Sequence, residues 1–181
     1  MRSVFAIVAF VVAAFASCGA HAAVGAADAG HLVLSYTVPV KATPAQAYAA
    51  TTDIARWWSA EHTYSGNAAN LHLDARPGGC WCEKLAAGGV EHMRVVLAMP
   101  GKLLRLAGGL GPLQSGALAG TLTFEFKAGA DGNAIAVSYV VSGYIDGGLD
   151  KIAAGVDKVL GDQLQRLQQF ADSGAAAAKP K

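Results

Sequence analysis

The sequence carries no excess of charge of either sign. It has 14 Lys and Arg residues against 13 Asp and Glu residues, and the two sums become equal if Arg2 is removed with an N-terminal leader. No basic patch and no interleaving of aromatic with basic residues occurs along the chain. Proteins that bind nucleic acid use such patches to contact phosphates. The sequence therefore argues against nucleic acid as a partner.

The motifs of the common enzyme and cofactor sites are also missing from the sequence. There is no Ser-His-Asp order of a nucleophilic triad and no dinucleotide fingerprint. The glycines that begin at Gly108 stand between two predicted strands, whereas a phosphate-binding loop leads from a strand into a helix. No C-x-x-C or H-x-x-x-H pair indicates a zinc site, and His62, His72 and His92 stand on different predicted elements. We therefore predict no catalytic residue, no metal site and no cofactor.

Cysteine is scarce, with three residues in the chain, and two of them, Cys80 and Cys82, are only two positions apart. On a strand their side chains point to one face, whereas Trp81 and Glu83 point to the other. Positions i and i+2 of an extended strand lie roughly 6.5–7 Å apart, at the far limit of disulfide geometry. The pattern leaves open a structural disulfide across a kinked strand, a redox pair, or two small buried thiols.

The N-terminus has the three parts of a secretory signal peptide. Arg2 supplies the positive charge, residues 4–15 form an apolar run, and residues 20–22 (Ala-His-Ala) have the pattern of a cleavage site. We therefore predict a signal peptide over residues 1–22 and a periplasmic or secreted protein. A cut before Cys18 is the alternative, and it would leave a lipoprotein with a lipid anchor at that cysteine. We predict no transmembrane segment in the mature chain, because charges interrupt its longest apolar pattern.

The most regular pattern of the mature chain runs from Leu149 to Phe170, where apolar residues recur at steps of three and four. This spacing places them on one stripe of an α-helix about 33 Å long. Gly155 leaves a notch at the edge of the stripe. Gln163 falls inside the apolar arc, where an amide without a partner costs about 1–3 kcal/mol. Its side chain is therefore expected to bond a strand backbone, to reach water at the helix end, or to be aimed into a cavity.

Short strand patterns and turns precede this helix. Alternation over residues 31–38 predicts a first strand, after which Thr43-Pro44 and Asp53 begin two short helices. About six further strands follow between residues 63 and 144, joined by glycine-rich turns. Strands joined in this way form an antiparallel sheet whose apolar face needs a cover. The predicted fold class is α+β: a helix-grip, in which a curved antiparallel sheet of about six to seven strands wraps around the long C-terminal α-helix.

This order and several local motifs resemble the START-like (SRPBCC) superfamily of polyketide cyclases, lipid-transfer domains and pollen allergens. The motifs are Thr43-Pro44-Ala45-Gln46-Ala47-Tyr48 after a strand, Trp57-Trp58, the turn Arg76-Pro77-Gly78-Gly79 before a Trp-bearing strand, and the alternating segment 121–126. The Trp-Trp pair and the Arg-Pro-Gly-Gly turn are most similar to the subgroup of heat-shock-ATPase activators. The expected organisation is a flexible segment over 23–30, a START-like helix-grip domain over 31–172 and a disordered tail over 173–181.

The resemblance implies an elongated cavity between the long helix and the sheet that holds a hydrophobic or amphipathic small molecule. It supplies no universal catalytic residue. In similar proteins a Trp two residues after the Gly-Gly turn points inward, which implies that Trp81 and Glu83 face the cavity. The residues predicted to contact the ligand come from the aromatic cluster, the strands and the helix stripe: Trp57, Trp58, His62, Tyr64, Trp81, Glu83, Phe124, Tyr139, Ile152, Val156, Val159 and Gln163.

We expect an exported binding protein for such a molecule, without turnover. The alternative is a cyclase- or isomerase-like enzyme that uses Glu83, His62 and Tyr64 as acid–base groups in the same cavity. Burial in an apolar pocket would raise the pKa of Glu83, as a general acid requires. The alternative for Glu83 is a salt bridge or a position at the rim. Trp57 and Trp58 are expected either to pack in the core or to border a ligand entrance. The remaining histidines are predicted to face solvent on strands: His31, His72 and His92.

Overall fold

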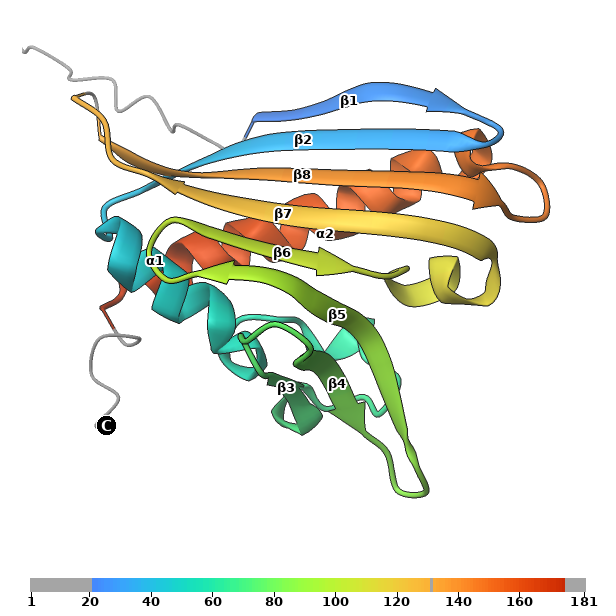
Figure 1. Ribbon diagram of the computed structural model, residues 1–181, viewed down its shortest axis with the longest axis horizontal. Coiled ribbons are helices and arrows are strands. Elements are labelled where there is room, and N and C mark those ends of the chain that lie inside the picture. The colour runs from blue at the N-terminus through green and yellow to red at the C-terminus, as the bar shows by residue number, and fades with distance from the viewer. Residues whose placement is uncertain (1–20, 131, 175–181) are drawn as a thin grey trace, which may run out of the picture.

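The computed structural model describes residues 21–130 and 132–174, which form one open antiparallel sheet of eight strands with a long helix across one face (Figure 1). The strands are β1 (His21–Asp28), β2 (His31–Val40), β3 (Leu71–Leu73), β4 (Cys80–Lys84), β5 (Gly89–Met99), β6 (Leu103–Ala107), β7 (Ala117–Lys127) and β8 (Asn133–Tyr144). Their order in the sheet is β1-β2-β8-β7-β6-β5-β4-β3. The fold class is α+β, as predicted from the sequence.

The sheet has more strands than the six to seven predicted, because residues 23–30 contribute to a strand instead of forming a flexible segment. Strand β1 pairs antiparallel with β2, from His21 opposite Thr37 to Asp28 opposite His31. The small residues of this segment have no apolar alternation that would predict a strand. It pairs instead with the free edge of β2, since an edge strand presents unpaired backbone groups, and it also contacts α2.

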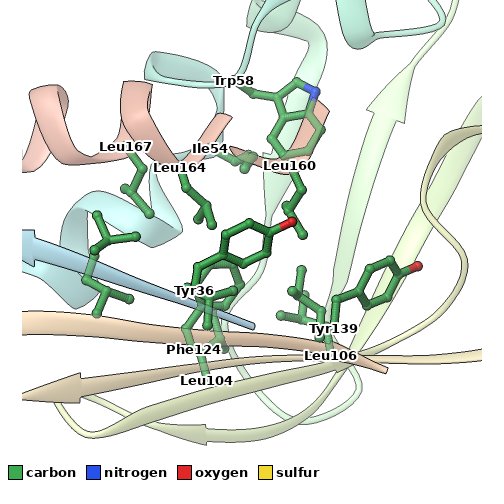
Figure 2. Close-up of a cluster of buried hydrophobic side chains, with 14 of the residues drawn as sticks. Tyr36, Ile54, Trp58, Leu104, Leu106, Phe124, Tyr139, Leu160, Leu164 and Leu167 are labelled. Carbon is green, nitrogen blue, oxygen red and sulfur yellow. The ribbon is translucent and has the colours of Figure 1, made fainter. Parts of the chain in front are cut away.

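The long helix α2 (Leu149–Asp172) confirms the predicted C-terminal helix. Its second half packs on the sheet through Leu160, Leu164 and Leu167, which are at most 4% exposed. Figure 2 shows these leucines pointing toward Phe124 and Leu104 on the strands below. The apolar stripe is therefore buried against the sheet, and this half of the layer between helix and sheet is solid.

Short helical turns connect β2 to β3. Helix α1 (Pro44–Thr52) begins with a capping box, in which the Thr43 and Gln46 side chains each accept a hydrogen bond from the other's backbone N–H. The second predicted short helix is a single 3₁₀ turn, η1 (Ile54–Arg56). Two more such turns, η2 (Ala60–His62) and η3 (Ala68–Asn70), lead into β3, and η4 (Gly111–Ser115) lies between β6 and β7. The chain after η1 lies against the second half of α2, where Arg166 donates to the Trp57 carbonyl and Gln163 accepts the Ser59 backbone N–H.

Several predictions concern residues outside the described part of the chain. The apolar run over 4–15, Cys18 and the tail from residue 175 onward belong to this group. The predicted cleavage site extends into the described part, since His21 and Ala22 are the first residues of β1. Among the helices of residues 21–130 and 132–174, none is long and apolar enough to cross a membrane.

Candidate functional site

A cavity of about 800 Å³ lies between the first half of α2 and the sheet. This volume is in the range of pockets that hold drug-sized molecules. The strands and the loops after η1 and β6 form its other walls. The residues that line it are Trp58, His62, Thr63, Tyr64, Leu71, Trp81, His92, Leu110, Gly111, Pro112, Tyr139, Lys151, Ile152, Gly155, Val156, Val159 and Leu160.

The first half of α2 contributes both small and branched side chains to the cavity wall. Gly155 and Val156 line it one turn before Leu160, with which the solid part of the layer begins. A Cβ atom added at Gly155 would meet nothing within 4 Å among the described residues. The notch that the sequence predicts at Gly155 is therefore open space in the structure.

Eight of the residues predicted to contact a ligand lie in the cavity wall: Trp58, His62, Tyr64, Trp81, Tyr139, Ile152, Val156 and Val159. The other predicted contacts lie elsewhere. Phe124 is in the solid part of the core (Figure 2). Trp57 is 2% exposed and donates its indole N–H to the Thr51 carbonyl at 3.3 Å. Glu83 is buried behind the wall, as described below.

Gln163 also lies outside the cavity wall, although its side chain is 1% exposed. Its Oε1 accepts a hydrogen bond from the backbone N–H of Ser59 at 2.7 Å. The amide thus connects α2 to the loop between η1 and η2. The structure contradicts the amide aimed into the cavity, and the backbone partner of Gln163 belongs to a loop and not to a strand as expected.

A β-bulge turns His92 toward the cavity. Trp81 pairs with Met93 and Cys82 pairs with Glu91, so His92 is an extra residue on β5. Both His92 and Met93 are buried, at 6% and 1% exposed, where strict alternation would place only one inside. The prediction that His92 faces solvent is therefore wrong, because alternation holds only where two strands keep a regular register. His72, on β3, is exposed as predicted.

The carboxylate of Glu83 holds the imidazole of His92. Oε2 of Glu83 lies 2.9 Å from Nε2 of His92, and it also accepts the backbone N–H of Tyr64 at 3.1 Å. Oε1 accepts the backbone N–H of Ser65 at 2.5 Å. These three hydrogen bonds position the ring and bind the loop at residues 64–65 to β4.

The hydrogen bonds also determine the protonation state of Glu83. Burial acts to raise the pKa of its carboxyl group, but hydrogen bonds from Ser65, Tyr64 and His92 together hold that pKa below its usual value. The expectation of a raised pKa is therefore wrong, although Trp81 and Glu83 are both buried as predicted, at 2% exposed. Glu83 is an ionised acceptor and cannot serve as a general acid.

Cys80 and Cys82 form a disulfide directly opposite the bulge. Their Cα atoms are 5.4 Å apart, closer than the roughly 6.6 Å that two extended residues span. The strand β4 is thus shortened where β5 carries its extra residue, His92. Of the alternatives that the sequence leaves open, the structure has the disulfide across a kinked strand.

Two tyrosines hold the loop over residues 108–116 against the cavity. The Tyr139 hydroxyl accepts the backbone N–H of Leu110 at 3.0 Å and donates to the Gly108 carbonyl at 3.2 Å. Burial raises the pKa of Tyr139 to about 12, and the bond from Leu110 only partly offsets this. The Tyr64 hydroxyl donates to the Gly111 carbonyl at 3.2 Å. Both hydroxyl protons are engaged within the protein.

The cavity is thus a mainly aromatic and aliphatic space with few polar groups at its surface. Trp58 and Trp81 meet edge to face, with ring centroids 4.8 Å apart. The rings of Tyr64 and Trp81 each lie 5.8 Å from that of His92. Lys151 is the charged residue of the wall, and its ammonium pairs with Asp150 at 3.0 Å. Within the described residues, no group of three or more His, Cys, Asp and Glu side chains could hold a metal ion.

Comparisons with known proteins show the fold but no function. An uncharacterised protein from Rhizobium leguminosarum is 23% identical with a TM-score of 0.58, over 85% of this chain and 98% of that one. A protein of unknown function from Staphylococcus aureus is 12% identical with a TM-score of 0.58, over 80% and 95% of the two chains. DynU16, encoded in the dynemicin biosynthetic locus, is 19% identical with a TM-score of 0.53, over 78% of this chain and 48% of its own. No family model and no curated protein matches the sequence.

Proposed function

We propose that this chain is a START-like helix-grip protein that binds a hydrophobic or amphipathic small molecule, without turnover, in the cavity between α2 and the sheet. The observation that carries the proposal is a cavity of about 800 Å³ with a mainly aromatic and aliphatic wall. Burying apolar ligand surface there contributes roughly 25 cal/mol per Å² before the costs of association. The similar folds of the solved structures are compatible with this family but name no ligand.

The engagement of the Glu83 carboxylate and of two tyrosine hydroxyls supports binding over turnover. Glu83 is ionised, and the hydroxyl protons of Tyr64 and Tyr139 are already donated to backbone carbonyls. An acid–base enzyme needs a group whose proton can reach the substrate. Of the predicted acid–base set, Glu83 and the Tyr64 hydroxyl are therefore engaged within the protein, and His62 lies in the wall.

Native mass spectrometry of protein purified from its own host tests the proposal. We expect a retained apolar molecule whose mass disappears in a Val156→Trp variant, because Val156 lies in the wall. A Val140→Trp variant is the matched control, since Val140 is 38% exposed on β8 and lies outside the wall. If neither a retained molecule nor saturable binding of an apolar dye is found, the proposal fails.

One observation favours a second candidate, an acid–base enzyme of the cyclase or isomerase type. The pair of Glu83 and His92 is buried at the wall, and a carboxylate that orients an imidazole is a common arrangement for a general base. In this version His92 would touch the substrate and Glu83 would be a positioning residue. Recovery of the bound molecule unchanged after prolonged incubation would exclude it, whereas a product with altered bonds would replace the binding proposal.

We also propose that the protein is exported, as the N-terminal sequence predicts. The disulfide between Cys80 and Cys82 supports this, because disulfides persist in oxidising compartments. The intact mass of the mature protein tests it: we expect a chain that begins at Ala23. A diacylated Cys18 would select the lipoprotein alternative, and a chain that still carries Met1 would contradict export.

A further inference from the structure

Two wall residues carry a polar ring atom without a hydrogen-bond partner among the described residues: the buried indole Nε1 of Trp81, which is a donor, and Nδ1 of His92. His92 is 6% exposed, and Glu83, its hydrogen-bond partner, is bound to Nε2. Among the described residues, no group forms a hydrogen bond with its Nδ1. His92 lines the cavity whereas Glu83 does not. The Nδ1 edge is therefore the part of the ring that can meet a bound molecule.

The partner at Nε2 determines what Nδ1 can do. The Glu83 carboxylate is ionised and only accepts hydrogen bonds, so Nε2 of His92 carries a proton. In the neutral imidazole, Nδ1 is then an acceptor. The Tyr64 ring, 5.8 Å away, cannot satisfy it, because the Tyr64 hydroxyl donates to Gly111. A buried acceptor in an apolar wall favours a ligand that brings a donor, since a ligand without one leaves the acceptor unpaired.

We propose that His92 is the specificity-determining residue of the cavity and that the ligand presents a hydroxyl donor, alcoholic or phenolic, to its Nδ1. The rest of the ligand is apolar and packs against Trp58, Trp81 and the small residues of α2. Glu83 acts through His92 as a positioning residue. This inference rests on the proposed binding function and specifies the chemical class of the ligand.

Binding of three naphthalene probes at neutral pH tests the inference. 2-Naphthol carries a phenolic donor, 2-naphthalenemethanol carries an alcoholic one, and 2-methoxynaphthalene has nearly the same shape but no donor. We expect at least one hydroxyl probe to bind about five- to tenfold more tightly than the ether. The hydroxyl probe with the larger affinity ratio over the ether shows whether a phenol or an alcohol is the better ligand class. Equal affinities for all three probes would overturn the inference but leave the proposed function intact, whereas no binding of any probe would refute both.

Two variants and a spectroscopic measurement connect the preference to His92. His92→Phe should reduce the difference between the hydroxyl probe and the ether to less than twofold, while His72→Phe, at an exposed histidine outside the wall, should keep it. Histidine ¹⁵N NMR on the native protein does not depend on whether His92→Phe folds. It should show the proton on Nε2 of His92 and a shift of Nδ1 when the hydroxyl probe, but not the ether, is added. An Nδ1 resonance that does not respond to the hydroxyl probe would overturn the inference.

Discussion

The Glu83 carboxylate accepts a hydrogen bond from Nε2 of His92 at 2.9 Å, and the two side chains are 0% and 7% exposed. Because the folded state holds the pKa of Glu83 below its usual value, the unfolded chain takes up this proton at a higher pH than the folded one. The stability that Glu83 contributes is therefore present above its usual pKa and is lost as the pH falls through the folded value.

Glu83→Gln tests this linkage. We expect the variant to lose about 1–3 kcal/mol of unfolding free energy at pH 7, because hydrogen bonds to a charged group are replaced by weaker ones. Urea titrations from pH 7 down to pH 3 should show the gap between native and variant protein narrowing below about pH 4.5, the usual value of Glu83. A gap that stays constant over this range would contradict the lowered pKa.

Gly155 and Gly161 permit a matched comparison on one helix. A Cβ at either position would meet nothing within 4 Å among the described residues, but only Gly155 lines the cavity. Each Gly→Ala change should therefore stabilise the protein by about 0.5–1 kcal/mol through helix propensity. Gly155→Phe should abolish dye binding while Gly161→Phe leaves it unchanged, as measured by fluorescence titration. Equal effects of the two phenylalanines would mean that the space at Gly155 is not the binding cavity.

Val156→Trp measures whether the first half of the layer is hollow. Overpacking a solid core typically costs 1–3 kcal/mol, whereas a side chain that enters an open cavity costs little or stabilises. We expect the melting temperature of Val156→Trp to stay close to that of the native protein, and Leu164→Trp, in the solid half, to lower it strongly. A large decrease for Val156→Trp would show that no cavity exists at that level.

Removing the disulfide tests its connection to the bulge. With Cys80 and Cys82 both replaced by Ser, β4 can extend and regular pairing with β5 becomes more favourable, which would turn His92 outward. We expect faster amide hydrogen exchange over residues 80–84 and 90–94, together with loss of the hydroxyl preference in the probe assay. A dithiol reductant should have the same effect on the native protein and none on the Ser variant. Unchanged amide hydrogen exchange in the Ser variant would show that the bulge does not depend on the disulfide.

Gln163→Leu should weaken the fold and not the binding. The substitution leaves the backbone N–H of Ser59 without its acceptor, which costs about 1–3 kcal/mol. Gln165→Leu, at an exposed position on the same helix, is the control for the change of residue type. Chemical denaturation and dye titration of both variants provide the two measurements. If Gln163→Leu bound the dye more weakly but kept native stability, the Gln163 amide would belong to the binding cavity, contrary to the structure.

The sequence by itself determined the elements in which apolar residues recur at a regular spacing. The apolar stripe of α2 repeats every three to four residues, and this spacing alone predicts a helix and its buried side. The inward direction of Trp81 and Glu83 follows in the same way from strand alternation and the family resemblance. The residues 23–30 have no such period, and the pairing that orders β1 comes from β2.

Only the tertiary structure decided which side chains line the cavity and which partners they bind. His92 faces inward because β5 has one residue more than β4 across their pairing, and the register of two strands is not contained in the pattern of either one. The low pKa of Glu83 depends on backbone N–H groups of Tyr64 and Ser65, which are 19 and 18 residues away along the chain. Gln163 likewise accepts a hydrogen bond from the backbone of Ser59, a residue 104 positions away along the chain. A local pattern gives the direction of a side chain, whereas the partner that it meets is set by long-range packing.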